Sequence, residues 1–126
     1  MTQTKQAIIA LCLILSSCTL ALAETGQASY YTVASCQREG TSGIKTATGE
    51  RYNEQALTCA LPWKPNNKEY MVVGPKGWAV LRHNDFGPGK GPRRKGVVID
   101  LTPRAFKEVC GELSLGKCQV SYQEVL

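Results

Sequence analysis

The sequence predicts a small, mostly β barrel with one short helix. The chain has 126 residues, which suits a single small domain behind an export segment. Six short runs rich in β-branched and aromatic residues are separated by turn-forming residues. A single stretch, 102–113, has the apolar spacing of an amphipathic helix. Many short strands with one helix are typical of a small barrel.

The predicted strands are short and rich in Val, Ile, Leu and Tyr. In chain order they are 28–33, 56–61, 69–74, 78–83, 96–101 and 118–125. The third and fourth strands flank Pro75-Lys76-Gly77, which favours a hairpin turn. Between the first two strands, the stretch 36–53 is rich in Gly, Ser and Thr, so we predict a long loop there.

The predicted helix 102–113 has a start signal and an apolar stripe. Thr102 suits the N-cap position, and Pro103 suits the first helical position. The stripe that would face the barrel consists of Ala105, Phe106, Val109 and Leu113.

The first residues of the chain have the pattern of an export signal. Lys5 precedes an apolar run from Ala7 to Leu15, and Ala21-Leu22-Ala23 is a small-x-small cleavage site. The run is shorter than the roughly 20 apolar residues that a membrane-spanning helix needs. We therefore predict a signal peptide over 1–23 and a domain over 24–126, located in the periplasm or outside the cell.

A second way of processing this segment stays open. Leu15-Ser16-Ser17-Cys18 resembles the lipobox of bacterial lipoproteins, in which the cysteine becomes the lipidated N-terminus. Lipidation at Cys18 would anchor the protein to the outer membrane, whereas cleavage after Ala23 would release it.

Four cysteines follow the predicted signal peptide, and an even number in an exported chain suggests disulfides. Four cysteines allow three pairings. Cys110 and Cys118 are close in sequence, so we expect them to pair, which leaves Cys36 with Cys59. No two cysteines are separated by two residues, and His83 is far from all four in sequence. We therefore expect no metal site and no cofactor.

The charge of the chain points to an anionic partner. The net charge is +5, and removal of 1–23 takes away a single lysine. Much of the excess lies in one loop with Lys90, Arg93, Arg94 and Lys95. Basic loops attract anionic polymers, and for an exported chain we expect an envelope polymer and no nucleic acid. A solvated loop that aids solubility is the alternative.

Four stretches, in their order and spacing, resemble one protein family. They are GQASYY (26–31), TATGERYN (46–53), HNDFGPG (83–89) and GVVIDLTPRAF (96–106). They resemble the double-psi β-barrel domain of the rare lipoprotein A (RlpA) family, which are bacterial septal lytic transglycosylases related to expansins and barwin-like proteins. The resemblance implies a six-stranded double-psi β-barrel over nearly all of 24–126.

The resemblance also implies an activity on peptidoglycan glycan strands, which would be cut without water to leave 1,6-anhydro ends. Glu50 and Asp85 match the acidic positions of the family motifs T-A-S-G-E and N-D-R-G-P. We expect three residues in the catalytic site. Asp85 would be the acid and base, Glu50 would bind or orient the sugar, and His83, on the same strand face as Asp85, would orient Asp85 or shuttle its proton. A monomer is expected, with substrate contacts from Tyr52, Asn84, Arg93 and Arg94.

The chain departs from the family at two places, which keeps other functions open. The stretch 57–62 reads LTCALP where the family has L-T-A-A-H before L-P, so that histidine is missing. Phe86 replaces the usual arginine. The missing histidine favours an expansin-like barrel that binds or loosens wall glycan without cleavage, whereas the retained Glu50 and Asp85 favour cleavage. An inhibitor or toxin with a barwin-like shell is a third possibility.

Overall fold

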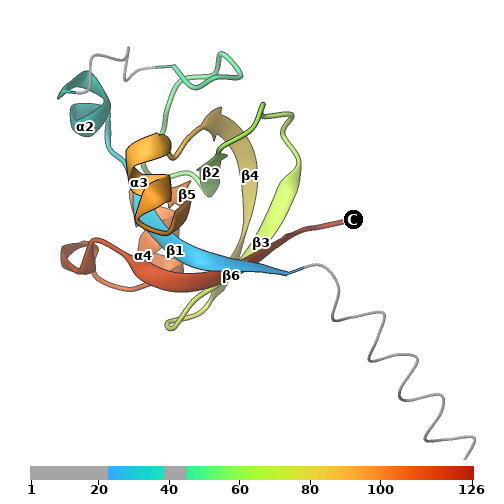
Figure 1. Ribbon diagram of the computed structural model, residues 1–126. Coiled ribbons are helices and arrows are strands. Elements are labelled where there is room, and N and C mark those ends of the chain that lie inside the picture. The colour runs from blue at the N-terminus through green and yellow to red at the C-terminus, as the bar shows by residue number, and fades with distance from the viewer. Residues whose placement is uncertain (1–22, 39–44) are drawn as a thin grey trace, which may run out of the picture.

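The computed structural model describes residues 23–38 and 45–126, and in this part of the chain six strands close into a barrel (Figure 1). The order of the strands around the barrel is β1-β5-β2-β4-β3-β6. The prediction of a mostly β barrel is confirmed. The strands are β1 (Glu24–Tyr30), β2 (Thr58–Leu61), β3 (Glu69–Val73), β4 (Trp78–Phe86), β5 (Val97–Leu101) and β6 (Cys118–Glu124).

The pairing of the strands brings four strand ends together. β1 pairs with β5 in parallel and β2 pairs with β4 in parallel, while the other four contacts are antiparallel. β2 and β5 overlap at only two residue pairs, Cys59 with Leu101 and Ala60 with Asp100. These pairs join the last two residues of β5 to the middle of the short β2, so the C-terminal parts of β1, β2, β4 and β5 lie next to one another there.

The structure has more helix than the sequence predicted. α4 (Pro103–Val109) lies within the predicted helix, and the Thr102 hydroxyl caps it by accepting from the Ala105 N–H at 3.2 Å. The prediction of a single helix is wrong, because α2 (Val33–Arg38) and α3 (Lys90–Arg94) are also helical, and η1 (Leu113–Leu115) is a 3₁₀ turn. α3 buries none of its residues, so it has no apolar stripe that could reveal it.

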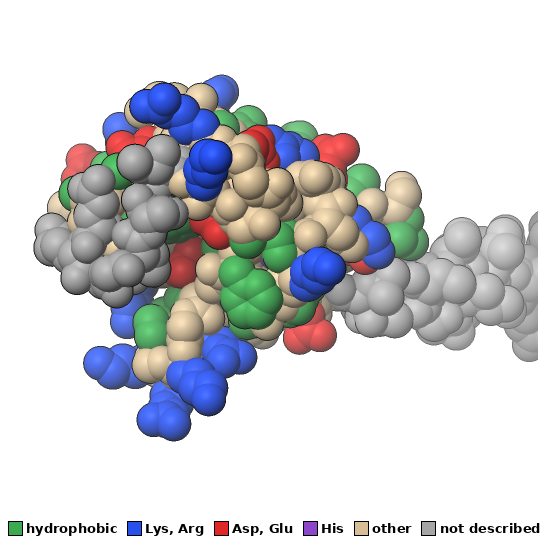
Figure 2. Space-filling model, turned by 90° about the horizontal axis from the view of Figure 1, so that it is seen from above, with side chains coloured by type: hydrophobic (Ala, Val, Ile, Leu, Met, Phe, Trp, Pro, Cys, Tyr) green, Lys and Arg blue, Asp and Glu red, His purple; other side chains and the backbone are tan. Residues whose placement is uncertain are grey.

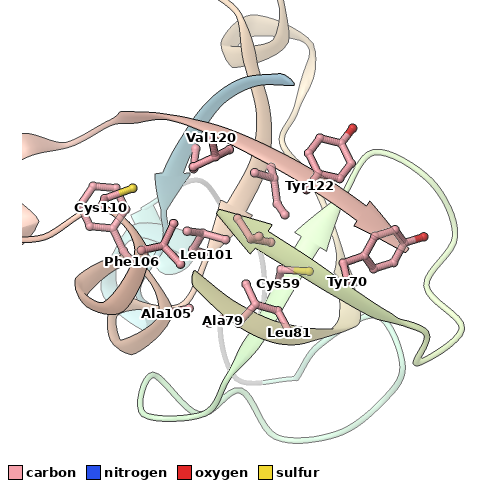
Figure 3. Packing of buried hydrophobic residues seen from close by; sticks show 14 of the residues in the cluster. Cys59, Tyr70, Ala79, Leu81, Leu101, Ala105, Phe106, Cys110, Val120 and Tyr122 are labelled. Carbon is pink, nitrogen blue, oxygen red and sulfur yellow. The ribbon is translucent and has the colours of Figure 1, made fainter. Parts of the chain in front are cut away.

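The core fills the inside of the barrel with residues that alternate along the strands (Figure 3). α4 covers one end with Phe106, whose ring meets that of Tyr30 edge-on at a centroid distance of 5.0 Å. Apolar side chains from the strands include Ala28, Leu61, Tyr70, Val72, Ala79, Leu81, Ile99, Leu101, Val120 and Tyr122.

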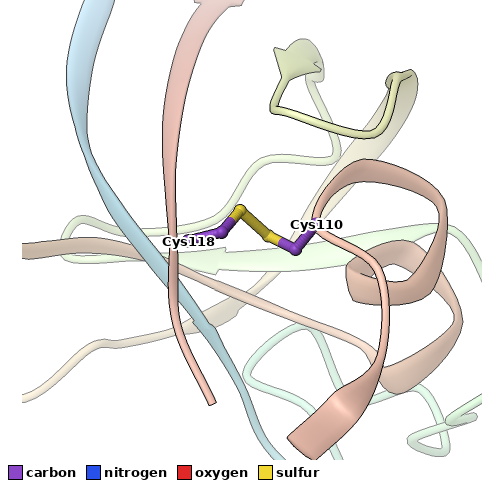
Figure 4. The surroundings of a disulfide bond; sticks show 2 residues. All are labelled: Cys110 and Cys118. Carbon is purple, nitrogen blue, oxygen red and sulfur yellow. A yellow bond between two sulfur atoms is a disulfide. The ribbon is translucent and has the colours of Figure 1, made fainter. Parts of the chain in front are cut away.

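One of the two predicted disulfides is present. Cys110 and Cys118 are bonded, with their Cα atoms 5.6 Å apart, and the bond ties the end of α4 to the start of β6 (Figure 4). The predicted Cys36–Cys59 bond is absent. Cys59 is completely buried in the core on β2, while Cys36 belongs to α2, which lies apart from the barrel wall (Figure 1).

Among the described residues, none of the helices has the length and apolar character that a membrane crossing requires. Residues 1–22, which hold Cys18 and nearly all of the predicted signal peptide, lie outside the described residues.

Candidate functional site

Two aspartates flank one small residue where the four strand ends meet. Asp85 of β4 and Asp100 of β5 both pair with Ala60 of β2. Neighbouring strands lie about 4.8 Å apart, so the two aspartate Cα atoms are about 10 Å apart. Cys59, the residue before Ala60, points into the core. The row of paired residues Asp85, Ala60 and Asp100 therefore points away from the core. The row therefore presents two carboxylates on the outer side of the barrel wall.

A β-bulge in β4 turns Asp85 to this outer side. His83 pairs with Cys59 and Asp85 pairs with Ala60, so Asn84 is the extra residue of the bulge. The regular alternation of a strand would have placed His83 and Asp85 on the same face. The prediction that they share a face is therefore wrong, and the cause is the bulge.

The carboxylate of Asp85 is held by three donors. The hydroxyl of Tyr31 donates to Oδ2 at 3.0 Å, while the N–H groups of Ala47 and Phe86 donate to Oδ1 at 3.0 and 2.9 Å. Asp85 is half-buried. Oδ1 thus has two protein donors and Oδ2 has one, which leaves Oδ2 with the greater capacity to exchange a proton with a ligand.

Two stacked tyrosines form one wall of the site. The rings of Tyr31 and Tyr52 are 4.5 Å apart at an interplanar angle of 9°, and the Tyr52 hydroxyl donates to the Tyr31 carbonyl at 2.7 Å. Burial and, next, the negative charge of Asp85 raise the pKa of Tyr31 well above its ordinary value, so the phenol keeps its proton and remains a donor. Tyr52 is only 7 % exposed. It therefore supports Tyr31. Tyr52 also borders a surface pocket, and its substrate contact stays a prediction.

Asp100 is a member of the site that the sequence analysis did not select. Its Oδ1 accepts a hydrogen bond from the Ser29 hydroxyl. Gly87, at φ +148°, passes so close that a Cβ there would lie 3.3 Å from Asp100 Oδ2 and 3.7 Å from the Ala60 Cβ. A signal was present in GVVIDL, where Asp100 is the one charged residue of a strand with buried apolar neighbours.

Glu50 makes an ion pair with β4. The guanidinium of Arg82 donates to both carboxylate oxygens, Nη1 to Oε1 at 2.6 Å and Nη2 to Oε2 at 2.9 Å, and Asn84 Nδ2 donates to Oε1 at 2.8 Å. The hydrogen bond from Arg82 is the largest of the effects that lower the pKa of Glu50 to about 2. Glu50 is therefore a carboxylate at neutral pH and cannot serve there as a proton donor.

The Glu50 ion pair fastens a loop that reaches Asp85. Glu50 closes a tight loop in which its carbonyl accepts from the Thr46 N–H at 2.8 Å. Within this loop Ala47 donates its N–H to Asp85. Glu50 thus acts through the loop, as a positioning residue for the carboxylate of Asp85.

His83 lies inside the barrel end, away from the Asp85 carboxylate. It is completely buried, and its ring meets the rings of Trp63 and Tyr70 edge-on at 6.0 Å each. Nε2 donates to the backbone carbonyl of Asp85 at 2.9 Å, while Nδ1 has no hydrogen-bond partner among the described residues. Burial lowers the pKa of His83 below its ordinary value, against the opposing effect of the Asp85 carbonyl. His83 therefore supports the backbone of β4, and among the described residues its ring makes no hydrogen bond to the carboxylate of Asp85.

The remaining predicted contacts fall into two groups. Asn84 is 2 % exposed and is used within the protein to hold Glu50. α3 is exposed along its whole length and carries Lys90, Arg93 and Arg94, which border one surface pocket. Figure 2 shows acidic side chains in a hollow, with Lys and Arg side chains projecting around it.

The described residues contain no group of three or more His, Cys, Asp or Glu side chains that could hold a metal ion.

The chain is similar to curated proteins over most of its length, although no protein-family profile matches it. It is 34 % identical over 79 residues to the endolytic peptidoglycan transglycosylase RlpA of Pasteurella multocida, covering 61 % of this chain and 26 % of that protein. It is 35 % identical over 97 residues to the probable endolytic peptidoglycan transglycosylase RlpA of a Nostoc species, covering 75 % and 24 %. The chain thus spans about a quarter of the length of these relatives.

Solved structures share the barrel. A mutant expansin of Clavibacter michiganensis in complex with cellohexaose matches with a TM-score of 0.62 at 19 % identity, covering 83 % of this chain and 51 % of that one. The Streptomyces papain inhibitor matches with a TM-score of 0.62 at 17 % identity, covering 86 % and 98 %. At these identities the likeness establishes the fold.

Proposed function

We propose that this chain, an RlpA-like double-psi β-barrel domain, cleaves peptidoglycan glycan strands as a lytic transglycosylase. The observation that carries the proposal is the outward-facing Asp85, held by three donors and separated from Asp100 by the small side chain of Ala60. The names of the curated relatives support this reaction class.

Asp85 serves as both acid and base in this reaction. In its protonated form it gives its proton to the glycosidic oxygen as the bond from that oxygen to the anomeric carbon breaks. The 6-hydroxyl oxygen of the same sugar then bonds to the anomeric carbon and loses its proton to the Asp85 carboxylate. The aspartic acid is regenerated, and the products are a 1,6-anhydro end and a free hydroxyl. Because no water is consumed, a second carboxylate is not required to activate one.

The neighbours of Asp85 have roles that follow from their contacts. Tyr31 orients Oδ2 by a hydrogen bond and stays protonated, so it does not compete as a base. Asp100 lies on the same outer row and adds negative charge, which stabilises the positive charge that develops on the sugar ring in the transition state.

The substrate fits the charge of the surface. Peptidoglycan presents carboxylates, and Arg93 and Arg94 of the exposed α3 would contact these groups. This substrate places the protein in the cell envelope. We propose cleavage after Ala23, with lipidation at Cys18 as the alternative, and N-terminal mass analysis of the mature protein distinguishes the two.

A second function, glycan binding without cleavage, is favoured by one observation. Glu50 is occupied by Arg82, and the stretch LTCALP lacks the histidine of the family motif, so neither group is available to assist Asp85 in cleavage. An expansin with this fold is known in complex with cellohexaose. In this case the same surface would bind glycan strands and release nothing.

Digestion of purified sacculi in water enriched with ¹⁸O distinguishes these functions. A lytic transglycosylase releases 1,6-anhydro ends without ¹⁸O, and a hydrolase would release reducing ends that carry it. If sacculi are bound but no fragment is released, the binding function replaces the proposed one.

A further inference from the structure

We infer that Phe86 is a stacking platform for the sugar ring next to the one at Asp85, an inference that rests on the proposed glycan substrate. Phe86 is the last residue of β4 and is 61 % exposed. Its N–H donates to Asp85 Oδ1 at 2.9 Å, and the N–H of Gly87 donates to the Leu61 carbonyl at 3.2 Å. The backbone that carries the ring is therefore fixed on both sides.

Folding does not explain an aromatic ring at this position. Phe86 is not part of the hydrophobic core cluster, and its exposed surface contributes no burial free energy. Single exposed apolar residues are common, so exposure alone carries no weight. What distinguishes Phe86 is that it directly follows Asp85, which forms part of the candidate site.

The geometry of the strand end indicates which sugar ring Phe86 contacts. The Cα atoms of Asp85 and Phe86 are about 3.8 Å apart, as in any trans peptide. Successive side chains of a strand point to opposite faces, and Phe86 pairs with Leu61 whereas Asp85 pairs with Ala60, so one sugar ring cannot lie on both. A sugar whose glycosidic oxygen is at Asp85 therefore leaves Phe86 to the adjacent ring of the same strand.

The surroundings of Phe86 fit a pyranose ring. A pyranose has an apolar C–H face, which suits a flat aromatic ring, and hydroxyls at its edge, which suit carboxylates. Asp85 and Asp100 supply such carboxylates nearby. An exposed Phe beside a basic helix would otherwise suit an anionic lipid surface. The negative charges of Asp85 and Asp100 repel such a surface. Figure 2 shows exposed hydrophobic side chains beside the hollow that holds acidic groups.

This residue distinguishes the chain from the family it resembles. The family motif reads N-D-R-G-P, whereas this chain reads Asn84-Asp85-Phe86-Gly87-Pro88. Exchange of arginine for phenylalanine removes a charge that would attract carboxylates and supplies a surface for stacking. We therefore assign to Phe86 a preference for the sugar ring itself over its acidic substituents.

The experiment measures binding of a peptide-free peptidoglycan tetrasaccharide by titration calorimetry, in an Asp85→Asn background that prevents turnover. Phe86→Ala should weaken binding about 3- to 10-fold, the range expected for one aromatic contact. Phe86→Trp should retain the affinity. Trp78→Ala is the matched control, because Trp78 is 64 % exposed at the opposite end of the same strand. This control should bind like the parent.

Unchanged affinity in Phe86→Ala, or an equal loss in Trp78→Ala, would overturn the inference. Failure of the parent to bind the tetrasaccharide would overturn it as well. If the parent binds and depends on Phe86, but the wild-type protein releases no anhydro sugar, the stacking site stands and the proposed cleavage fails.

Discussion

Replacement of Glu50 by glutamine should destabilise the fold in a pH-dependent way. Arg82 holds the pKa of Glu50 at about 2, against an ordinary value of 4.5. A shift of this size corresponds to about 3.4 kcal/mol, at about 1.36 kcal/mol per pKa unit. The Arg82 and Glu50 side chains are 39 % and 37 % exposed, so solvent screens the pair strongly. We therefore expect a loss of about 1 kcal/mol in the free energy of unfolding at pH 7.

The sign of the pH effect follows from the lowered pKa. A carboxylate with a lower pKa in the folded state contributes its full stability above its unfolded pKa of about 4.5. That contribution falls between about pH 4.5 and pH 2, as the proton returns. The difference between wild type and Glu50→Gln should therefore shrink almost to zero at pH 2.

Urea unfolding at pH 7 and at pH 2 measures both differences. Glu124→Gln is the control, because Glu124 pairs with Lys68 through a single contact at 3.1 Å and lies far from Asp85 in sequence. Hydrogen exchange of the Ala47 amide gives a second readout, since it should become faster in Glu50→Gln than in the control. A difference that is the same at both pH values, or no larger than that of Glu124→Gln, would refute the reasoning.

Two further predictions concern the stability of the barrel domain and its binding to peptidoglycan sacculi. Replacement of Cys110 and Cys118 by serine should lower the free energy of unfolding by about 2.5 kcal/mol, because the disulfide closes a short loop and so reduces the entropy of the unfolded chain. Denaturant unfolding of both proteins, and of the wild type with and without reductant, measures this difference. Equal midpoints would contradict a stabilising bond. Arg93→Gln with Arg94→Gln should weaken sacculus pull-down at low salt and matter less near 0.15 M, where charges are screened over about 8 Å. Lys117→Gln is the control, because it removes an exposed charge elsewhere on the barrel. If the wild type, the double variant and the control bind sacculi equally at low salt, α3 does not bind the polymer and only aids solubility.

The barrel could be predicted because its signals are local. β-branched and aromatic residues mark β3, β4, β5 and β6, and the cap at Thr102 with the proline at Pro103 marks α4. β1 has few such residues, and it spans Glu24–Tyr30 instead of the predicted 28–33. β4 extends to Phe86, beyond its predicted end, because the polar residues that follow Leu81 remain paired with β2. Polar residues at the end of a strand give no local signal of continued pairing.

The site could be predicted only in part, because it is built by contacts between distant strands. Asp85 was found through its motif, but the bulge at Asn84 that turns it away from His83 depends on the register with β2. Asp100 joins the site through Ala60, a residue with no chemical signal of its own. The error at Cys36 and Cys59 has the same origin, since burial of Cys59 in the core is a property of the closed barrel.

The most direct test of the proposed mechanism compares anhydro-sugar release by the wild-type protein and by Asp85→Asn on the same purified sacculi. The amide keeps the shape of the side chain and still accepts at Oδ1, but it cannot donate or take up the proton. General acid–base catalysis is worth about 10²- to 10⁴-fold, so release should fall by that factor with an unchanged melting temperature. Release by Asp85→Asn at the wild-type rate would contradict the assignment of Asp85 as the acid and base.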